Sequence, residues 1–261
     1  MKNRNQWLRR AVLGISVLLP LSAWAQDACP PEGTDASSLA LLKEQRFVID
    51  DVAVRDALAM GLLGCLSSPD PALRDGMAYE AFTQWLRNDQ LQPEVRAQLR
   101  DRLYDMLKEA DEAGFRQSFA ALVLSEVART DRISPWMSPA ERVAMVKAAT
   151  QYLRSVTDYR GFDNTEGWRH GVAHGSDWLL QLALNPGVER AQLDQILEAI
   201  ATQVVPESGH AYVFGEPGRL ARPVLYIAKR GLLSEAEWTT WFSALPARIG
   251  DASQAYSNTD W

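Results

Sequence analysis

The sequence predicts an all-α protein in which antiparallel helix pairs stack into one curved domain. Three observations lead to this fold class: helix-start signals recur at short intervals, apolar residues follow them at helical spacing, and no β-hairpin dipeptide is flanked by alternating apolar residues. No long Gly/Ser or Pro linker divides the chain, so a single domain is expected.

The first 25 residues are expected to form a secretory signal peptide. Residues 1–10 are basic, residues 11–21 are apolar, and Ala23-Trp24-Ala25 has the small-x-small pattern of a cleavage site. The apolar run is too short to span a membrane, and no later stretch reaches that length. We therefore expect a mature protein without an integral membrane segment, periplasmic or secreted, with the general secretory route favoured over the twin-arginine route.

Residues 26–35 are expected to form a short leader that carries the first of two cysteines. Cys29 lies in a Pro/Gly-rich stretch, and Cys65 ends an apolar segment. In an oxidising compartment an even pair of cysteines usually forms a bridge, so we expect a Cys29–Cys65 disulfide. The alternative is that Cys65 is a small buried apolar residue.

Capping signals define the helices of the domain, residues 36–261. Asp70-Pro71 opens a helix through about Arg87, and Ser138-Pro139-Ala140-Glu141 is a capping box with proline at the first helical position. Ser234-Glu235-Ala236-Glu237 is a second capping box, ahead of Trp238, Trp241, Phe242 and Leu245. The other helices are expected at about 36–47, 51–66, 93–110, 114–129, 167–184, 189–204 and 217–230. Pro223 lies inside the last of these, so that helix should kink or begin late.

The charge of the mature chain argues against two classes of partner. Removal of the first 25 residues takes away four basic side chains and leaves 23 basic against 33 acidic, a formal charge of −10. Nucleic acid and anionic lipid surfaces would both repel a protein of this charge. The expected partner is therefore a small molecule or a protein that the sequence does not identify.

The polar chemistry is concentrated in residues 167–178. On a helix, the spacing places His170, His174 and Asp177 along one stripe. Gly171 and Gly175 in the same helix indicate close approach of another backbone or of a ligand. Three interpretations remain open for the stripe: a structural hydrogen-bond network, an organic-ligand or catalytic site without a metal, and a metal site.

The metal interpretation depends on the residue types. Two imidazoles and one carboxylate can supply three ligands to Zn²⁺ and leave a position for water, and the same set suits Mn. The glutamate of a metalloprotease helix is absent between the two histidines. The sequence therefore implies no cofactor with certainty. If the stripe binds one, we expect a divalent metal, Zn or Mn.

Neighbouring segments supply further candidate site residues. His210, Glu216 and Arg219 are expected to reach the stripe from the following loop and helix, although Glu216 also fits a helix cap. Arg160 and Asp163, in the polar turn just upstream, are expected to form the rim of a concave polar pocket.

A run from Phe115 to about Trp241 resembles a bacterial family known as domain of unknown function 2785. The matching pieces are Ser118-Phe119-Ala120, Asp158-Tyr159-Arg160-Gly161-Phe162, Gly167-Trp168-x-His170-x3-His174-x2-Asp177 and Gly215-Glu216-x2-Arg219-Leu220. The sequence departs from the family pattern at Arg169, where a small residue is expected. The resemblance implies an all-helical, HEAT-like protein and assigns no activity.

Two functions follow from these observations. The first is an exported soluble binding or scaffold protein with a polar pocket around His170, His174 and Asp177. The alternative is a metal-dependent, hydrolase-like enzyme that uses the same three residues as metal ligands. A phosphate-binding glycine loop, a G-x-S-x-G nucleophile elbow and a cysteine metal pair are absent from the sequence.

Overall fold

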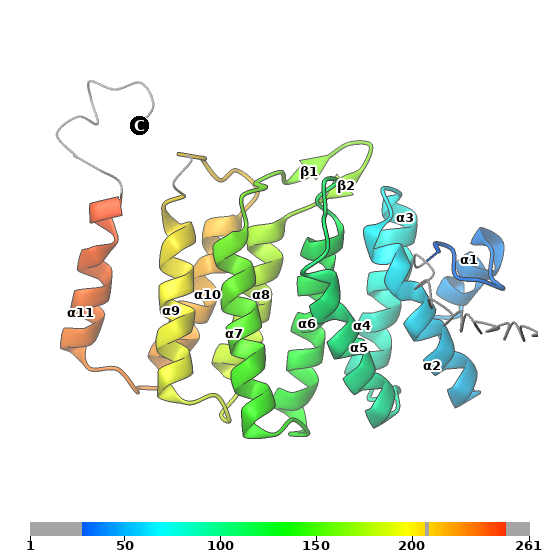
Figure 1. The fold of residues 1–261 in the computed structure, drawn as a ribbon, viewed down its shortest axis with the longest axis horizontal. Helices are drawn as coiled ribbons and strands as arrows, with labels where there is room; N and C mark the ends of the chain where they lie inside the picture. Colours follow the sequence, from blue (N-terminus) through cyan, green and yellow to red (C-terminus); the bar gives the residue numbers. More distant parts are fainter. Residues whose placement is uncertain (1–27, 207–208, 249–261) are drawn as a thin grey trace, which may run out of the picture.

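The computed structural model describes residues 28–206 and 209–248 as a row of packed helices (Figure 1). The expected signal peptide and the first two residues of the leader lie outside this part of the chain. The prediction of an all-α protein is confirmed, since the described elements are helices apart from one short hairpin. Within the described residues, no helix combines the length and the apolar character needed to cross a membrane.

The N-terminal part packs around a disulfide. Helix α1 spans Ala36–Glu44, α2 spans Val52–Gly61, and a 3₁₀ turn, η1, spans Leu62–Ser67. The expected Cys29–Cys65 disulfide is confirmed, and it joins the leader to the fully buried Cys65 of η1. The leader is therefore held against the first helices.

One nearly continuous helix follows, interrupted by a π-helical turn. It consists of α3 (Pro71–Leu73), the π turn η2 (Arg74–Tyr79) and α4 (Glu80–Arg87). The Asp70 carboxylate accepts a hydrogen bond from Ala72 N at 2.8 Å and so caps the start that the sequence predicts. Arg74, the first residue of the π turn, is completely buried.

Three helices form the middle of the row. Helix α5 spans Pro93–Met106, α6 spans Arg116–Ile133 and α7 spans Pro139–Ser155. Both hydrogen bonds of the predicted capping box between Ser138 and Glu141 are present at the start of α7.

A two-stranded hairpin that the sequence analysis did not predict precedes α8. Strand β1 (Phe162–Asp163) pairs antiparallel with β2 (Gly167–Trp168), at the upper edge of the row in Figure 1. Helix α8 spans Gly171–Leu184, so the expectation of a helix from residue 167 is wrong by four residues. The hairpin occupies the residues that were expected to form the first turn.

Three helices complete the described chain. Helix α9 spans Arg190–Val204, α10 spans Glu216–Lys229 and α11 spans Glu235–Ala244, followed by a short 3₁₀ turn, η3 (Pro246–Arg248). Helix α10 contains Pro223 and nevertheless begins at Glu216, so the expected late start is not observed. The predicted capping box at Ser234 and Glu237 is present.

The helices from α6 onward form two layers. Helix α6 packs against α8 and α8 packs against α10, while α7 packs against α9 on the other side. Trp178 of α8 is fully buried, and its ring stacks on Tyr104 of α5 with centroids 6.4 Å apart. This arrangement places α8, with its histidines, at the centre of the molecule and α11 at its end (Figure 1).

Candidate functional site

The start of α8 is held by the backbone of the hairpin. Arg169 N donates to Gly161 O at 3.0 Å, and His170 N donates to Arg160 O at 3.1 Å, which extends the strand pairing to the helix. His170 is the N-cap and has a left-handed backbone, with φ of 57°. This conformation is uncommon for a residue with a side chain, but histidine adopts it more often than most. It turns the chain from the hairpin into the helix.

His170 lies against Glu216, the first residue of α10. Its Nε2 atom is 3.4 Å from Glu216 Oε1, and both side chains are at least nine-tenths buried. The geometry of this contact is not that of a hydrogen bond, and the buried His170 Nε2 has no other hydrogen-bond partner among the described residues. Burial lowers the pKa of His170, and the neighbouring Glu216 carboxylate opposes this shift only in part. The imidazole also stacks on Trp168, with ring centroids 4.6 Å apart.

His174 lies one turn further and faces α6. Its Nδ1 atom is 3.1 Å from Ser118 O, and because a carbonyl only accepts, Nδ1 carries the proton. The ring meets Phe119 edge to face and lies 5.8 Å from the His170 ring, centroid to centroid. Burial lowers the pKa of His174 to about 3, so this imidazole is neutral at ordinary pH.

Asp177 lies on the α10 side of α8, where it forms an ion pair with Arg219. Burial raises the pKa of Asp177, and the Arg219 guanidinium opposes the shift. Glu216 and Arg219, three residues apart on α10, therefore meet His170 and Asp177 of α8. These two contacts hold the first turn of α10 against α8.

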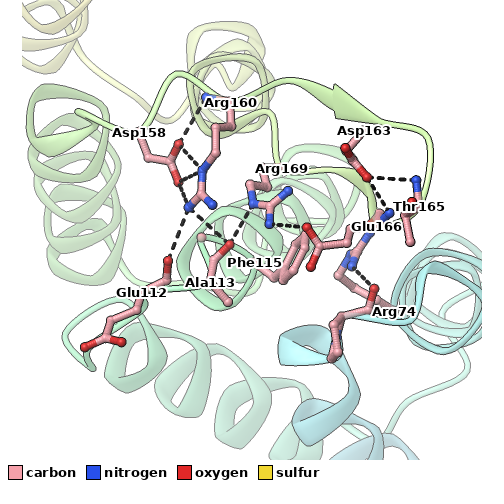
Figure 2. A network of polar contacts seen from close by, with 12 residues as sticks. Arg74, Glu112, Ala113, Phe115, Asp158, Arg160, Asp163, Thr165, Glu166 and Arg169 are labelled. Carbon is pink, nitrogen blue, oxygen red and sulfur yellow. Dashed lines mark hydrogen bonds and ion pairs between the residues drawn. The ribbon is translucent and has the colours of Figure 1, made fainter.

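The side chains of the other expected site residues make contacts elsewhere. His210 stacks on Tyr159, with ring centroids 4.8 Å apart and nearly parallel planes. Arg160 pairs with Asp158, at 2.8 Å from Nε to Oδ1, and also donates to the carbonyl of Ala113 (Figure 2). The Asp163 carboxylate accepts hydrogen bonds from the backbone N–H groups of the turn that follows it, so it stabilises the hairpin.

Two arginines that were not among the predicted site residues complete the polar network of Figure 2. Arg74 donates to Glu166 O at 2.6 Å, and Arg169 donates to Ala113 O at 2.7 Å and to the Glu166 carboxylate at 2.8 Å. Both guanidinium groups lie over the Phe115 ring, at 4.0 and 4.2 Å from its centroid. The arginines fasten the hairpin to α6 and to the π turn. The burial of Arg74 has no sequence signal, because its partner Glu166 lies 92 residues away.

The polar cluster of His170, His174, Asp177, Glu216 and Arg219 is closely packed. The crevice lined by Arg160, His170, Tyr212 and Glu216 has no volume that a water molecule can occupy. In the part of the chain that the structure describes, no three His, Cys, Asp or Glu side chains are grouped so that they could hold a metal ion. The three residues proposed as metal ligands instead face Glu216, Ser118 O and Arg219. Zn or Mn binding stays a prediction that metal analysis of untagged protein can test.

A large apolar groove lies on another side of α10. It has a volume of about 580 Å³ between α9, α10 and α11. Its lining residues are Ile200, Val204, Tyr212, Pro217, Leu220, Ala221, Val224, Leu225, Ala228, Trp238, Trp241, Phe242 and Leu245. Leu225 and Phe242 are 52% and 53% exposed, so the groove opens to solvent between α10 and α11.

The groove exists because α11 packs loosely at the end of the row. None of the residues of α11, all of which the structure describes, is buried. Its apolar residues Trp238, Trp241 and Phe242 pack on one another, with centroids 4.9 to 6.1 Å apart. They form one wall of the groove, and no described residue covers the opposite wall on α10.

Comparison with known proteins gives one match. The family model described as "Protein of unknown function (DUF2785)" matches residues 103–261. No curated protein and no solved structure matches the chain. The matched residues include α8, α10 and every element of the groove.

Proposed function

The chain belongs to the family described as "Protein of unknown function (DUF2785)", whose description assigns no activity, and we propose from the geometry that it is an exported binding protein for an apolar ligand. The ligand site is the groove between α9, α10 and α11, which we name the α10 groove. The localisation follows from the basic, apolar and small-x-small pattern of residues 1–25, and the protein would act in the periplasm or outside the cell.

The volume and lining of the α10 groove carry this proposal. Small-molecule sites in proteins are concave, mostly apolar, and about 300–1,000 Å³ in volume. The α10 groove, at 580 Å³, lies within that range and has twelve apolar lining residues and one tyrosine. A ligand that covers such a surface gains about 25 cal/mol for each Å² of apolar area removed from water.

The polar cluster lies on the other side of α10 and positions the wall of the groove. The contacts Glu216–His170 and Arg219–Asp177 join the first turn of α10 to α8. Pro217, Leu220 and Ala221, on the same two turns, line the groove. In this proposal the histidine stripe positions the wall of the groove and does not itself bind the ligand.

A neutral fluorescent probe, N-phenyl-1-naphthylamine, tests the proposal. Wild-type protein should raise the probe's emission with saturable, one-site binding. Ala221→Trp, which adds a bulky side chain to the groove wall, should weaken that binding at least tenfold. The matched control is Ala236→Trp, at an exposed position of α11 that does not line the groove, and it should bind within twofold of wild type.

Two results would contradict the proposal. One is wild-type protein that leaves the probe's emission unchanged. The other is equal affinity of Ala221→Trp and wild type when both have the same melting temperature.

A further inference from the structure

We infer that the α10 groove holds the alkyl chain of a long-chain fatty acid, with the carboxylate at the groove's exposed lip. This inference rests on the proposed function and adds the chemical class of the ligand. Its support comes from the elongated shape of the groove, the hydrogen-bonding capacity of its lining, and the charges beside its lip.

The groove is elongated. The lining residues of α10 run from Pro217 to Ala228, about 17 Å along the helix axis. The volume of about 580 Å³ is spread along this length between α9, α10 and α11. An elongated apolar groove of this kind suits a long hydrocarbon chain.

The lining excludes an extended peptide. Each peptide residue brings an N–H donor and a C=O acceptor, which need partners when they are removed from water. The polar side-chain atoms in the lining are the Tyr212 hydroxyl and the indole nitrogens of Trp238 and Trp241. The hydroxyl already contacts Gln203 O at 2.9 Å and Gln203 Oε1 at 3.0 Å, and Trp241 Nε1 donates to Leu197 O at 3.3 Å. The lining side chains therefore offer too few acceptors for the N–H groups of a peptide and too few donors for its carbonyls. A chain of methylene groups needs no such partner, so its burial in this lining leaves no hydrogen bond of the ligand unmade.

Two cations lie beside the exposed lip. Leu225 forms the lip on α10, and Arg222 and Lys229 lie three residues before it and four residues after it, which makes them its neighbours on the helix surface. Within the described chain, neither cation forms an ion pair with an acidic side chain. Asp177, whose carboxylate responds to the charge of Arg222, is already paired with Arg219.

These cations indicate that the head group of the ligand carries a negative charge. The mature chain carries a formal charge of −10, which repels anionic membrane surfaces as a whole. Lys229 Nζ lies over the Tyr226 ring, 5.0 Å from its centroid, and Arg222 acts on the already paired Asp177 only through its charge. Both cations therefore keep the capacity to attract a single carboxylate beside the groove. A fatty acid combines that charge with a chain that the groove accommodates.

Displacement of N-phenyl-1-naphthylamine by saturated fatty acids of 8 to 18 carbons, below their micelle-forming concentrations, tests the inference. Affinity should rise about fourfold for each added methylene until the chain exceeds the groove's length of about 17 Å, and then level off. At low ionic strength, the methyl ester of the same chain should bind at least tenfold more weakly than the acid.

Charge variants test the head-group assignment. Arg222→Gln/Lys229→Gln should remove the difference between acid and ester and leave the affinity for the neutral probe unchanged. The matched control is Lys147→Gln/Arg154→Gln, which removes two cations from α7, outside the groove, and should preserve the difference.

The possible failures are distinguishable. If the probe binds but fatty acids of every length fail to displace it, the ligand assignment is wrong and the proposed function stands. Equal affinity of acid and ester overturns the carboxylate assignment. Displacement by an amphipathic helical peptide at lower concentration than by any fatty acid overturns the assignment in favour of a protein partner. If the probe does not bind, the proposed function fails first.

Discussion

At the scale of single residues, His174 gives the folded state a pH-dependent stability. The neutral imidazole donates from Nδ1 to Ser118 O, and burial lowers its pKa from 6.5 to about 3. In the unfolded chain the same group takes up a proton near pH 6.5. The unfolded state therefore binds more protons between these two values, and stability is full above pH 6.5 and is lost as the pH falls toward 3.

We expect the free energy of unfolding to fall by about 2 kcal/mol between pH 7 and pH 5 through this one residue. His174→Asn keeps a donor near the Nδ1 position but removes the titration, so its stability should change less over that interval. Denaturant unfolding at the two pH values measures the difference. His210→Asn, which removes an imidazole from the loop, is the control. Equal pH dependence in His174→Asn and wild type would contradict this account.

The sequence indicates some of the residue contacts and misses others. The spacing of His170, His174 and Asp177 on one stripe, with Glu216 and Arg219 on the next helix, predicted residues that the structure places in contact. His210 was expected at the same place, but it stacks on Tyr159, because the loop after α9 directs it there. Arg74 could not be predicted, because only the folded chain brings it to Glu166 and Phe115.

At the scale of elements, the two glycines of α8 determine how closely it packs on α7. A methyl group added at Gly175 would lie 3.0 Å from Tyr152 Cε1 and 3.2 Å from Leu153 Cδ1. Tyr152 is buried and donates from its hydroxyl to Gly171 O at 3.3 Å, so it has little room to move. The sequence indicated close approach here, and the approaching groups are side chains of α7.

Gly175→Ala should therefore lower the free energy of unfolding, by about 1 kcal/mol net. Alanine gains about 1 kcal/mol of helix propensity, but overpacking of a core costs about 1–3 kcal/mol. Gly218→Ala in α10 is the matched control, because a methyl group there meets nothing within 4 Å. It should raise the free energy of unfolding by about 0.5–1 kcal/mol. A stabilised Gly175→Ala protein would show that α7 and α8 are not in close contact.

At the starts of α8 and α10, the structure differs from what the local sequence pattern predicts. The sequence Asp163-Asn164-Thr165-Glu166-Gly167 carries a turn signal, with aspartate first and a left-handed glycine last, between the aromatic residues Phe162 and Trp168. Helical spacing in the following residues concealed that signal. Pro223 is buried on the inner face of α10, where packing maintains the helix despite the missing N–H group.

At the scale of the whole molecule, the two ends of the row differ in how they are secured. The first helices are joined to the leader by the Cys29–Cys65 disulfide, which closes a loop with a sequence separation of 36 residues. In the chain-entropy model such a loop contributes about 3–4 kcal/mol. The other end has no comparable constraint among the described residues, and there the α10 groove is open. Ligand binding at this end would add stability that grows with the logarithm of ligand concentration above the Kd.

The all-helical architecture could be predicted from the sequence, whereas the α10 groove could not. Trp238, Trp241, Phe242 and Leu245 follow helical spacing, which predicts a buried face. Whether another helix covers that face depends on where α11 lies relative to α10, and no local pattern contains that information. The histidines stand out in the sequence because the chain has only three of them. The groove consists of apolar residues of the same types as those in the hydrophobic core, so the sequence does not distinguish them.

Hydrogen–deuterium exchange with and without hexadecanoate tests the central claim, that this groove is the ligand site, most directly. Bound ligand should slow exchange in peptides covering residues 200–204, 217–228 and 238–245, and should leave α1 to α5 unchanged. Unchanged exchange in all of these segments at saturating ligand, or protection confined to residues 158–170 around the polar network, would contradict the account.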